Sequence, residues 1–371
     1  MAEAVGLYSA RTMATDQGRG LHLTGLNGLR AIAALAVVVS HLNHALPEFG
    51  LPRGTSSKLA EYGVTIFFAL SGFLITYLLL LERTQSRIDI KKFYIRRILR
   101  IWPLYYVNLF VVVALLYSRT PDVLPGSLPF YVLLSANLPF AFGTALVGLE
   151  HYWSLGVEEQ FYLFWPWLVR RFHNPLRPIL VFTVAYVALR SALRLLPATS
   201  GLPYLLMFVT RFDCMAIGAI GAILYARRTP WFYRFAQHRL VQVVSWFVVG
   251  LLLANRFFVP LVGHDAIAIV TVCIIVAQVT RTNRLISLEN RPAEFLGKIS
   301  YGIYVLHPLV ITCCAAILPS SAPTPAKYAL VYGVVIGTTV LLAHLSYVTL
   351  ERPFLRRKER YAIVRTQAAV R

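Results

Sequence analysis

YGVTIFFALSGFLITYLLLL, residues 62–81, contains no charged residue and is long enough to cross a bilayer as a single helix. A hydrocarbon layer about 30 Å thick requires roughly 20 apolar residues in helical conformation. The run YALVYGVVIGTTVLLAHLSYVTL, residues 328–350, meets the same requirement. The chain has 371 residues, of which 57% are hydrophobic and only 14% are charged, a balance outside that of soluble domains. The sequence therefore predicts an all-α polytopic membrane protein.

The formal net charge of +20 would suggest a nucleic-acid partner in a soluble protein. Here the Lys and Arg residues lie in short segments between apolar runs, which is the pattern of topology signals, so no nucleic-acid binding is expected. The four cysteines all lie inside apolar runs, and none has the spacing of metal ligands. They predict neither a disulfide framework nor a metal site.

About ten spanning helices are expected, with both termini in the cytoplasm. The predicted spans are 27–46, 62–81, 101–117, 152–169, 178–195, 204–225, 240–257, 264–280, 297–318 and 328–350. The segments then assigned to the cytoplasm are 1–30, 82–100, 170–177, 226–240, 281–298 and 351–371. They contain most of the 36 Lys and Arg residues, as the positive-inside rule requires.

The apolar segment 128–147, LPFYVLLSANLPFAFGTALV, is not counted as a span. It contains two prolines and is interrupted by Ser135 and Asn137, which favours a re-entrant or interfacial piece over a straight helix. Counting it as a span would reverse the charge bias of every later loop.

One domain is expected, because no repeat of fixed period and no linker divides the chain. Its predicted limits are an N-terminal cytoplasmic tail at 1–22, a transmembrane domain at 23–357 and a C-terminal cytoplasmic tail at 358–371. The first tail has no apolar core of the signal-peptide kind, so the first helix is expected to be uncleaved.

Ionisable residues fall inside several predicted spans. They are Arg30, His41, Glu158, Glu159, Arg190, Arg211, Asp213 and His307. A charge in the bilayer centre costs at least about 2.5–3.5 kcal/mol, so these side chains are expected to face one another or a wet cavity. For the arginines a structural role stays open, with Arg211 paired to Asp213, or Arg190 paired to a glutamate, as a brace between helices.

Arg30 and His41 are 11 residues apart, which places them on one face of the first helix and about 16 Å apart along its axis. A neutral imidazole can accept a proton from a hydroxyl near physiological pH. We predict that His41 is the catalytic base and that Glu158 orients its ring. The alternative for a lone histidine in a membrane helix is a packing hydrogen bond.

The segment ERTQSRIDIKKFYIRRILRIWPLYY, residues 82–106, is dense in cations. Lys92, Arg96 and Arg100 are spaced by four residues, with Arg97 beside them, so a short interfacial helix would carry a strip of positive charge. Such a strip binds phosphates, or it sets topology and contacts anionic headgroups. A phosphate-rich donor in the cytoplasm and a histidine base deeper in the membrane together predict group transfer across the bilayer.

Seven motifs in order resemble the acyltransferase-3 family of bacterial integral membrane O-acyltransferases. They are NGLRAIAALAVVVSH, FFALSGFLI, RRILRIWPLYY, WSLGVEEQFYLFWP, RFDCMAIGA, KISYGIYVLHP and SYVTLERPF, between about Leu23 and Arg357. The resemblance implies transfer of an acyl group, most often acetyl from acetyl-CoA, to hydroxyls of surface polysaccharides, O-antigens, peptidoglycan, Nod factors or macrolides. It also implies about ten spans in the bacterial cytoplasmic (inner) membrane, and acyl-CoA as a donor substrate with no bound cofactor.

The resemblance also implies roles for single residues. The arginine and histidine that the family separates by ten residues match Arg30 and His41, and the histidine is taken as catalytic. The family's arginine pair on the acyl-CoA side matches Arg97 and Arg100, and the glutamate of its tryptophan-led motif matches Glu158.

Two features differ from common family members. Asn27 stands where an aspartate is frequent, which removes an acidic partner from Arg30. Polysaccharide-modifying members often append an extracytoplasmic esterase-like domain, whereas this sequence ends at Arg371, so the stand-alone membrane form is expected.

The resulting hypothesis places the phosphates of acyl-CoA against Arg96, Arg97 and Arg100, with Arg30 at the inner end of a cavity. His41 either deprotonates the acceptor hydroxyl or carries the acyl group itself. Four more residues are expected to line the cavity: Arg211, Asp213, Tyr301 and His307. The acceptor is expected to be a saccharide, with a small-molecule hydroxyl and a longer acyl group such as succinyl left open. A secondary transporter and an inactive partner in export assembly are the alternatives.

Overall fold

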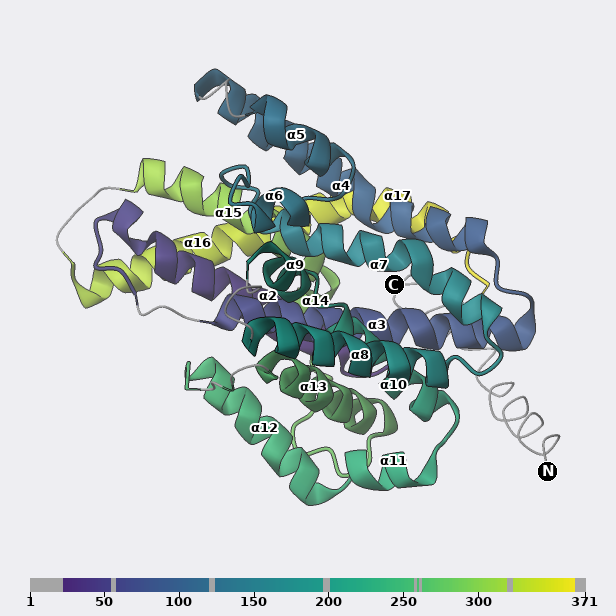
Figure 1. Ribbon diagram of the computed structural model, residues 1–371. Helices are drawn as coiled ribbons and strands as arrows, with labels where there is room; N and C mark the ends of the chain where they lie inside the picture. The colour runs from purple at the N-terminus through teal and green to yellow at the C-terminus, as the bar shows by residue number, and fades with distance from the viewer. Residues whose placement is uncertain are drawn as a thin grey trace, which may run out of the picture.

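The computed structural model describes residues 23–54, 58–119, 124–195, 201–256, 259, 262–318 and 323–363, and these residues form helices without a strand (Figure 1). The predicted all-α class is therefore confirmed. Within this part of the chain, eight helices are long and apolar enough to cross a membrane, or nine if one bent pair counts as a single span. The protein is a multi-pass membrane protein.

The eight spans are built on α2 (Leu26–Ala45), α3 (Leu59–Gln85), α4 (Ile90–Arg119), α8 (Leu176–Leu195), α9 (Leu202–Thr210) with α10 (Phe212–Ala226), α13 (Gly263–Thr280), α15 (Ser300–Ile317) and α16 (Pro325–Ser346). The bent pair is α11 (Pro230–Ala236) with α12 (Arg239–Leu253), whose axes differ by 53°.

Two of the ten predicted spans do not meet these criteria as single helices. The helix α12 has only 15 residues. The helix α7 (Tyr152–Arg171) has 20 residues, but adjacent glutamates and terminal arginines lower its apolar character. It nevertheless runs back along α4 to the end of the bundle where Arg83 donates a hydrogen bond to the carbonyl of Phe172.

The basic segment is continuous with the third span, which corrects the prediction of a separate interfacial helix. The helix α4 is a single helix of 30 residues that includes Pro103. The expected span 204–225 is instead broken at Arg211, whose φ of 43° lies in the left-handed region and separates α9 from α10.

As predicted, the segment 128–147 is not a straight helix. The short helices α5 (Leu124–Val132) and α6 (Asn137–Ala141) are separated by a turn in which Leu134 has a φ of 57°. The carbonyls of Phe130 and Tyr131 accept backbone hydrogen bonds within this turn, and that of Tyr131 also accepts one from the hydroxyl of Tyr105, which suits irregular backbone at membrane depth.

The described parts of the six segments predicted to be cytoplasmic gather at one end of the bundle. Hydrogen bonds join them in a chain through the pairs Asn27–Glu294, Asn283–Gln237, Arg227–Asn174, Arg83–Phe172 and Arg96–Tyr361. We call this the basic end. Segments predicted to lie on the same side of the membrane are thus found at the same end of the bundle, as the positive-inside argument requires.

The centre of the bundle is α3, which packs against α2, α7, α10 and α13 (Figure 1). The closest approach is to α10, because a Cβ atom on Gly72 would lie 1.9 Å from the carbonyl oxygen of Met215, and one on Gly218 would lie 2.1 Å from that of Ala69. Small residues of this kind let helix backbones meet within a membrane.

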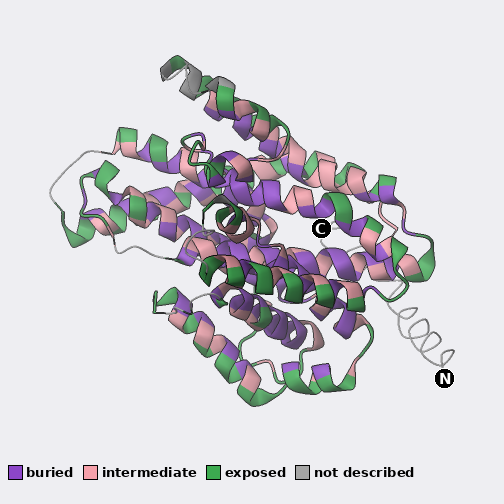
Figure 2. Ribbon diagram, in the orientation of Figure 1, coloured by how far each residue is buried: buried purple, intermediate pink, exposed green. Residues whose placement is uncertain are grey.

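Buried residues line the inner faces of these helices, whereas exposed ones follow the periphery (Figure 2). Large apolar side chains are among the exposed ones, such as Phe110 at 74% and Val181 at 69%. An apolar periphery is expected of helices that face acyl chains.

The C-terminal helices continue one another at the basic end. After α16, a π-helical segment (Tyr347–Glu351) leads into α17 (Arg352–Glu359), so the helical path extends beyond the predicted span 328–350 and includes two residues of the predicted tail. This continuation brings α17 against α4.

Candidate active site

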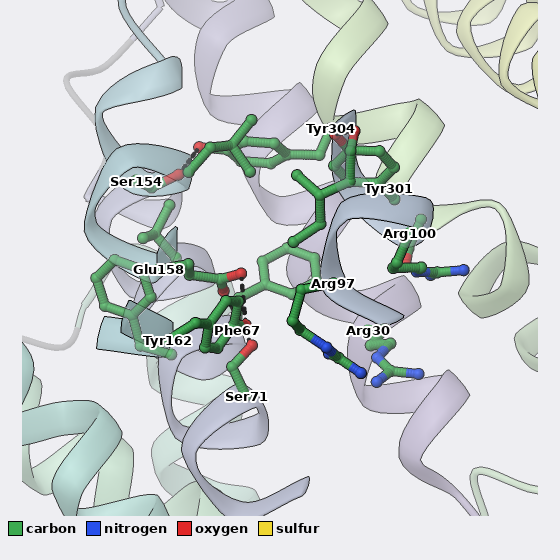
Figure 3. Close-up of a pocket in the computed structure, with 15 residues that line it drawn as sticks. Arg30, Phe67, Ser71, Arg97, Arg100, Ser154, Glu158, Tyr162, Tyr301 and Tyr304 are labelled. Atoms are coloured by element: carbon green, nitrogen blue, oxygen red, sulfur yellow. Dashed lines mark hydrogen bonds between the residues drawn. The ribbon is translucent and has the colours of Figure 1, made fainter. Parts of the chain in front are cut away.

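A cavity of about 720 Å³, counting the space at its open mouth, lies among α2, α3, α4, α7 and α15 (Figure 3). Five of the predicted site residues line it: Arg30, Arg97, Arg100, Glu158 and Tyr301. The three arginines lie toward one end of the cavity, and Ser154 and Tyr304 lie at the other. The packing of these helices brings together residues that are far apart in the sequence.

Arg30 is held by an amide in place of a carboxylate. Its Nη1 donates to Oδ1 of Asn27 at 3.3 Å, and Nδ2 of Asn27 donates to a carboxylate oxygen of Glu294 at 2.8 Å. The neutral Asn27 side chain therefore connects Arg30 to an acidic residue without pairing the guanidinium with a charge.

Arg97 and Arg100 are three residues apart on α4 and share a helix face. The guanidinium of Arg97 lies over the rings of Phe93 and Tyr162, at 5.8 Å from each centroid. Its Nε is buried and has no hydrogen-bond partner among the described residues. A buried N–H group without a partner can donate a hydrogen bond to an acceptor atom of a bound ligand.

Arg96 is directed away from this cavity. Its guanidinium donates to Glu82 at 2.8 Å and to the carbonyl of Tyr361 at 2.9 Å. Lys92 lies 3.8 Å from Asp89. The predicted strip of Lys92, Arg96 and Arg100 is therefore wrong as a single ligand-facing row, because Arg96 binds Glu82, Lys92 lies beside Asp89, and only Arg100 lines the cavity.

Glu158 is bound on both carboxylate oxygens within the cavity. Ser71 donates to one oxygen at 2.9 Å, and the hydroxyl of Tyr162 donates to the other at 3.0 Å. The predicted contact of Glu158 with His41 is not formed. Glu158 instead fixes the phenol ring on which Arg97 packs.

His41 contacts a histidine that the sequence placed only among the cavity-lining residues. Its Nδ1 lies 2.6 Å from Nε2 of His307, and the two rings meet edge to edge, with an interplanar angle of 23° and centroids 4.9 Å apart. Nδ1 of His307 lies 2.7 Å from the carbonyl oxygen of Tyr304. His307 thus connects His41 to the inner end of the cavity, although neither histidine lines the cavity itself.

The family model described as an acyltransferase domain matches residues 23–345. The chain belongs to this acyltransferase-3 family. The match begins at the first residue of the predicted transmembrane domain and covers every residue of the cavity wall.

Several curated relatives of this acyltransferase-3 chain are similar over most of its length. The O-acetyltransferase OatA of Staphylococcus aureus (strain NCTC 8325 / PS 47) is 28% identical over 366 residues, which is 90% of this chain and 57% of the relative. The peptidoglycan O-acetyltransferase OatA of Listeria monocytogenes and the putative peptidoglycan O-acetyltransferase YrhL of Bacillus subtilis are also 28% identical, over 90% of this chain and 56% and 55% of their own lengths. The chain thus spans little more than half the length of these relatives. No solved structure is significantly similar to it.

Lys358 adds a fourth cation to Arg30, Arg97 and Arg100 in this acyltransferase-3 structure, although it belongs to the predicted C-terminal tail, 358–371. Lys358 on α17 is close enough to Arg100, Arg97 and Arg30 for their charges to interact. Among the described residues, none of these four cations has a carboxylate oxygen within 4 Å. The basic cluster of SYVTLERPFLRRK was the available signal, but only the packing of α17 on α4 places Lys358 here.

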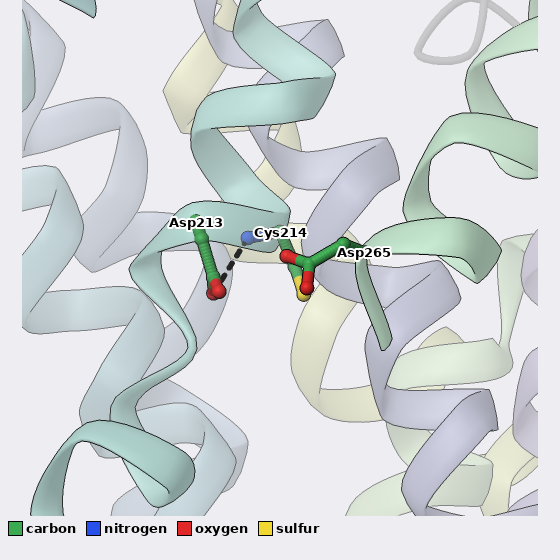
Figure 4. Close-up of side chains that lie close together, drawn as sticks. All are labelled: Asp213, Cys214 and Asp265. Atoms are coloured by element: carbon green, nitrogen blue, oxygen red, sulfur yellow. Dashed lines mark hydrogen bonds between the residues drawn. The ribbon is translucent and has the colours of Figure 1, made fainter. Parts of the chain in front are cut away.

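Asp213 does not line the cavity, as was predicted for it. Arg190 binds Asp213 through Nη1 and Asp265 through Nη2, the latter at 2.5 Å. Of the two pairings considered as an alternative, neither is formed: Asp213 binds Arg190 in place of Arg211, and Arg190 binds aspartates in place of a glutamate. Figure 4 shows the two aspartates close to Cys214, with ligand atoms within 4.8 Å of one another. Because one guanidinium already binds both carboxylates, the cluster is a buried ion triad.

Arg211 also lies outside the cavity. Its Nε donates to the carbonyl of Phe208 at 2.9 Å, and Nη1 donates to the carbonyl of Glu61 at 3.2 Å. Its guanidinium lies 4.8 Å from the ring centroid of Phe208. These contacts indicate that Arg211 braces neighbouring helices, which is the structural alternative for the arginines.

Proposed function

We propose that this protein is a membrane O-acyltransferase that transfers an acyl group, most often acetyl, from acyl-CoA to a hydroxyl of a glycan. The observation that carries the proposal is a group of cations that have no carboxylate oxygen within 4 Å among the described residues. Arg30, Arg97 and Arg100 line one end of the cavity, and Lys358 on α17 is close enough for its charge to interact with theirs. These like charges repel one another, and Glu158 in the same cavity offsets part of that repulsion. An anionic ligand would offset the rest.

Coenzyme A fits this requirement. Its diphosphate and ribose phosphate present several acceptor oxygens, and guanidinium groups bind phosphates through paired hydrogen bonds. The cavity opens beside the arginines, so the phosphates could lie at its mouth while the acyl end enters it. The acyl end of the donor would extend past Glu158 toward Ser154 and Tyr304.

The transfer step follows from this placement. His41 takes the proton of the acceptor hydroxyl while the acceptor oxygen bonds to the thioester carbonyl carbon. The carbon–sulfur bond then breaks, and the thiolate leaves with the proton returned by His41. Glu158 acts on the donor side, because it holds Tyr162 and through it the guanidinium of Arg97.

The glycan acceptor is proposed from the relatives, two of which carry names that specify peptidoglycan. The positive-inside rule assigns the basic end to the cytoplasm, where acyl-CoA is available, and it places both termini there. The acceptor then approaches from the opposite side of the bacterial cytoplasmic membrane. This arrangement needs no bound cofactor.

The test is release of CoA from acetyl-CoA by the protein in lipid nanodiscs, with and without purified glycans, for wild type, His41→Ala and Arg100→Gln. We expect release that rises with one glycan fraction and is lost in His41→Ala, whereas Arg100→Gln raises the KM for acetyl-CoA. Transfer that persists in His41→Ala at the same protein level would refute the role of His41. Donor binding that ignores Arg100 would refute the donor site.

A further inference from the structure

The contact between His41 and His307 determines which ring nitrogens carry protons. Nδ1 of His307 lies 2.7 Å from the carbonyl oxygen of Tyr304, and a carbonyl oxygen can only accept. Nδ1 of His307 therefore carries a hydrogen. In the neutral imidazole, Nε2 of His307 is then the acceptor.

The same reasoning extends to His41. Because Nε2 of His307 accepts, the nitrogen 2.6 Å away, Nδ1 of His41, must donate. The other nitrogen of His41, Nε2, is left with its lone pair. This is the protonation state that a general base requires.

We propose that His307 is the positioning residue of the acyl transfer, which fixes His41 in the Nδ1–H tautomer and leaves Nε2 as the base. The assignment of a transfer role to His41 rests on the proposed function, whereas the tautomer follows from the two contacts of His307 and from its neutral state in a fully buried position. His307 here does what a carboxylate does in many catalytic triads.

Burial explains why a neutral partner suits this position. The side chain of His307 is 0% exposed, and the edge of its ring packs against His151 with centroids 5.2 Å apart. Nε2 of His151 lies 3.1 Å from the carbonyl of Val305, so this second ring is also held in one tautomer. A carboxylate at this fully buried position would carry a large desolvation cost, which a neutral imidazole avoids.

During transfer the bond between the two rings strengthens. When Nε2 of His41 takes the proton of the acceptor hydroxyl, the imidazolium donates through Nδ1 to a neutral acceptor, and the hydrogen bond becomes charge-assisted. The positive charge stays on His41, because moving it to His307 would place it in a fully buried ring.

The direct test is the tautomeric state of His41, from nitrogen-15 spectra of ring-labelled protein in lipid, with the signals assigned by loss in His41→Ala and His307→Leu. We expect a protonated Nδ1 and an unprotonated Nε2 for His41 in the wild type, and a mixture of tautomers in His307→Leu. A protonated Nε2 in the wild type would overturn the proposal. This measurement needs no turnover, so it separates failure of the tautomer assignment from failure of the proposed function.

Kinetics test the consequence. We expect His307→Leu to lower kcat by roughly 10²–10³-fold with an unchanged KM for acetyl-CoA. His307→Gln, whose side-chain carbonyl can reach the position of Nε2, should restore kcat to within about tenfold of wild type. The control is His344→Leu, on an exposed position of α16. Full activity in folded His307→Leu, or no difference between the Leu and Gln variants, would refute the positioning role.

Discussion

The hydroxyl oxygens of Ser154 and Tyr304 lie 2.6 Å apart at the inner end of the cavity, and the Tyr304 hydroxyl donates to the carbonyl of His151 at 2.9 Å. Both side chains line the cavity, and His307 follows one helical turn after Tyr304. The phenol ring therefore limits how far a donor can extend from the arginines toward His41.

The first prediction concerns this limit. Tyr304→Ala should enlarge the inner end and raise the ratio of butyryl to acetyl transfer by roughly tenfold, because each methylene in an apolar pocket contributes about 0.8 kcal/mol. The backbone carbonyl that binds His307 is retained. The ratio of kcat/KM values for the two donors is the measurement, and an unchanged ratio would show that the acyl group lies elsewhere.

The second prediction concerns the cations at the mouth. Lys358→Gln should raise the KM for acetyl-CoA by roughly 10-fold with little change in kcat, because a hydrogen bond to a charged group contributes about 1.5–3 kcal/mol. The matched control is Arg357→Gln, an exposed neighbour on the same helix whose guanidinium lies over Phe354. Equal KM values for the two variants would mean that Lys358 acts only through the net charge of the basic end.

The third prediction concerns the link from Arg30 through Asn27 to Glu294. Asn27→Asp would place two carboxylates against each other where the present distance is 2.8 Å, and the new ion pair with Arg30 would offset part of this repulsion, so the free energy of unfolding should fall by about 1 kcal/mol. The double variant Asn27→Asp with Glu294→Gln restores one donor and one acceptor and should recover most of this loss. Thermal unfolding in detergent provides the measurement. A stable single variant would show that the amide is not required.

The fourth prediction concerns the ion triad of Arg190, Asp213 and Asp265 (Figure 4). Arg190→Leu leaves two buried carboxylates without their cation and should lower the free energy of unfolding by about 3–5 kcal/mol. The triple variant Arg190→Met, Asp213→Asn and Asp265→Asn removes all three charges and should be more stable than the single variant. Arg194→Leu, at an exposed position of the same helix, is the control. Destabilisation of the triple variant equal to that of the single one would contradict this assignment.

Much of the architecture could be predicted from the sequence, because hydrophobic length and charge distribution act locally. Residues 62–81 are long enough to span and form the middle of α3, and the prolines and polar residues of 128–147 interrupt that segment. Likewise, Arg97 and Arg100 share a face of α4, because their spacing along a helix determines their direction.

Contacts between helices could not be read in the same way. His41 and His307 are separated by 266 residues, and Arg190 and Asp265 by 75, so their pairing depends on which helix faces pack together. For the same reason, Arg96 binds Glu82 and does not line the cavity. Lys358 lies near the arginines of the cavity only because α17 packs on α4.

The sequence by itself determined that this protein is a bundle of membrane helices with cations at one end and ionisable groups at depth. Both properties follow from the length, periodicity and charge of single segments. The tertiary structure alone decided the partner of each buried group. A buried ionisable side chain must be satisfied by whatever lies opposite it, and helix packing places that partner.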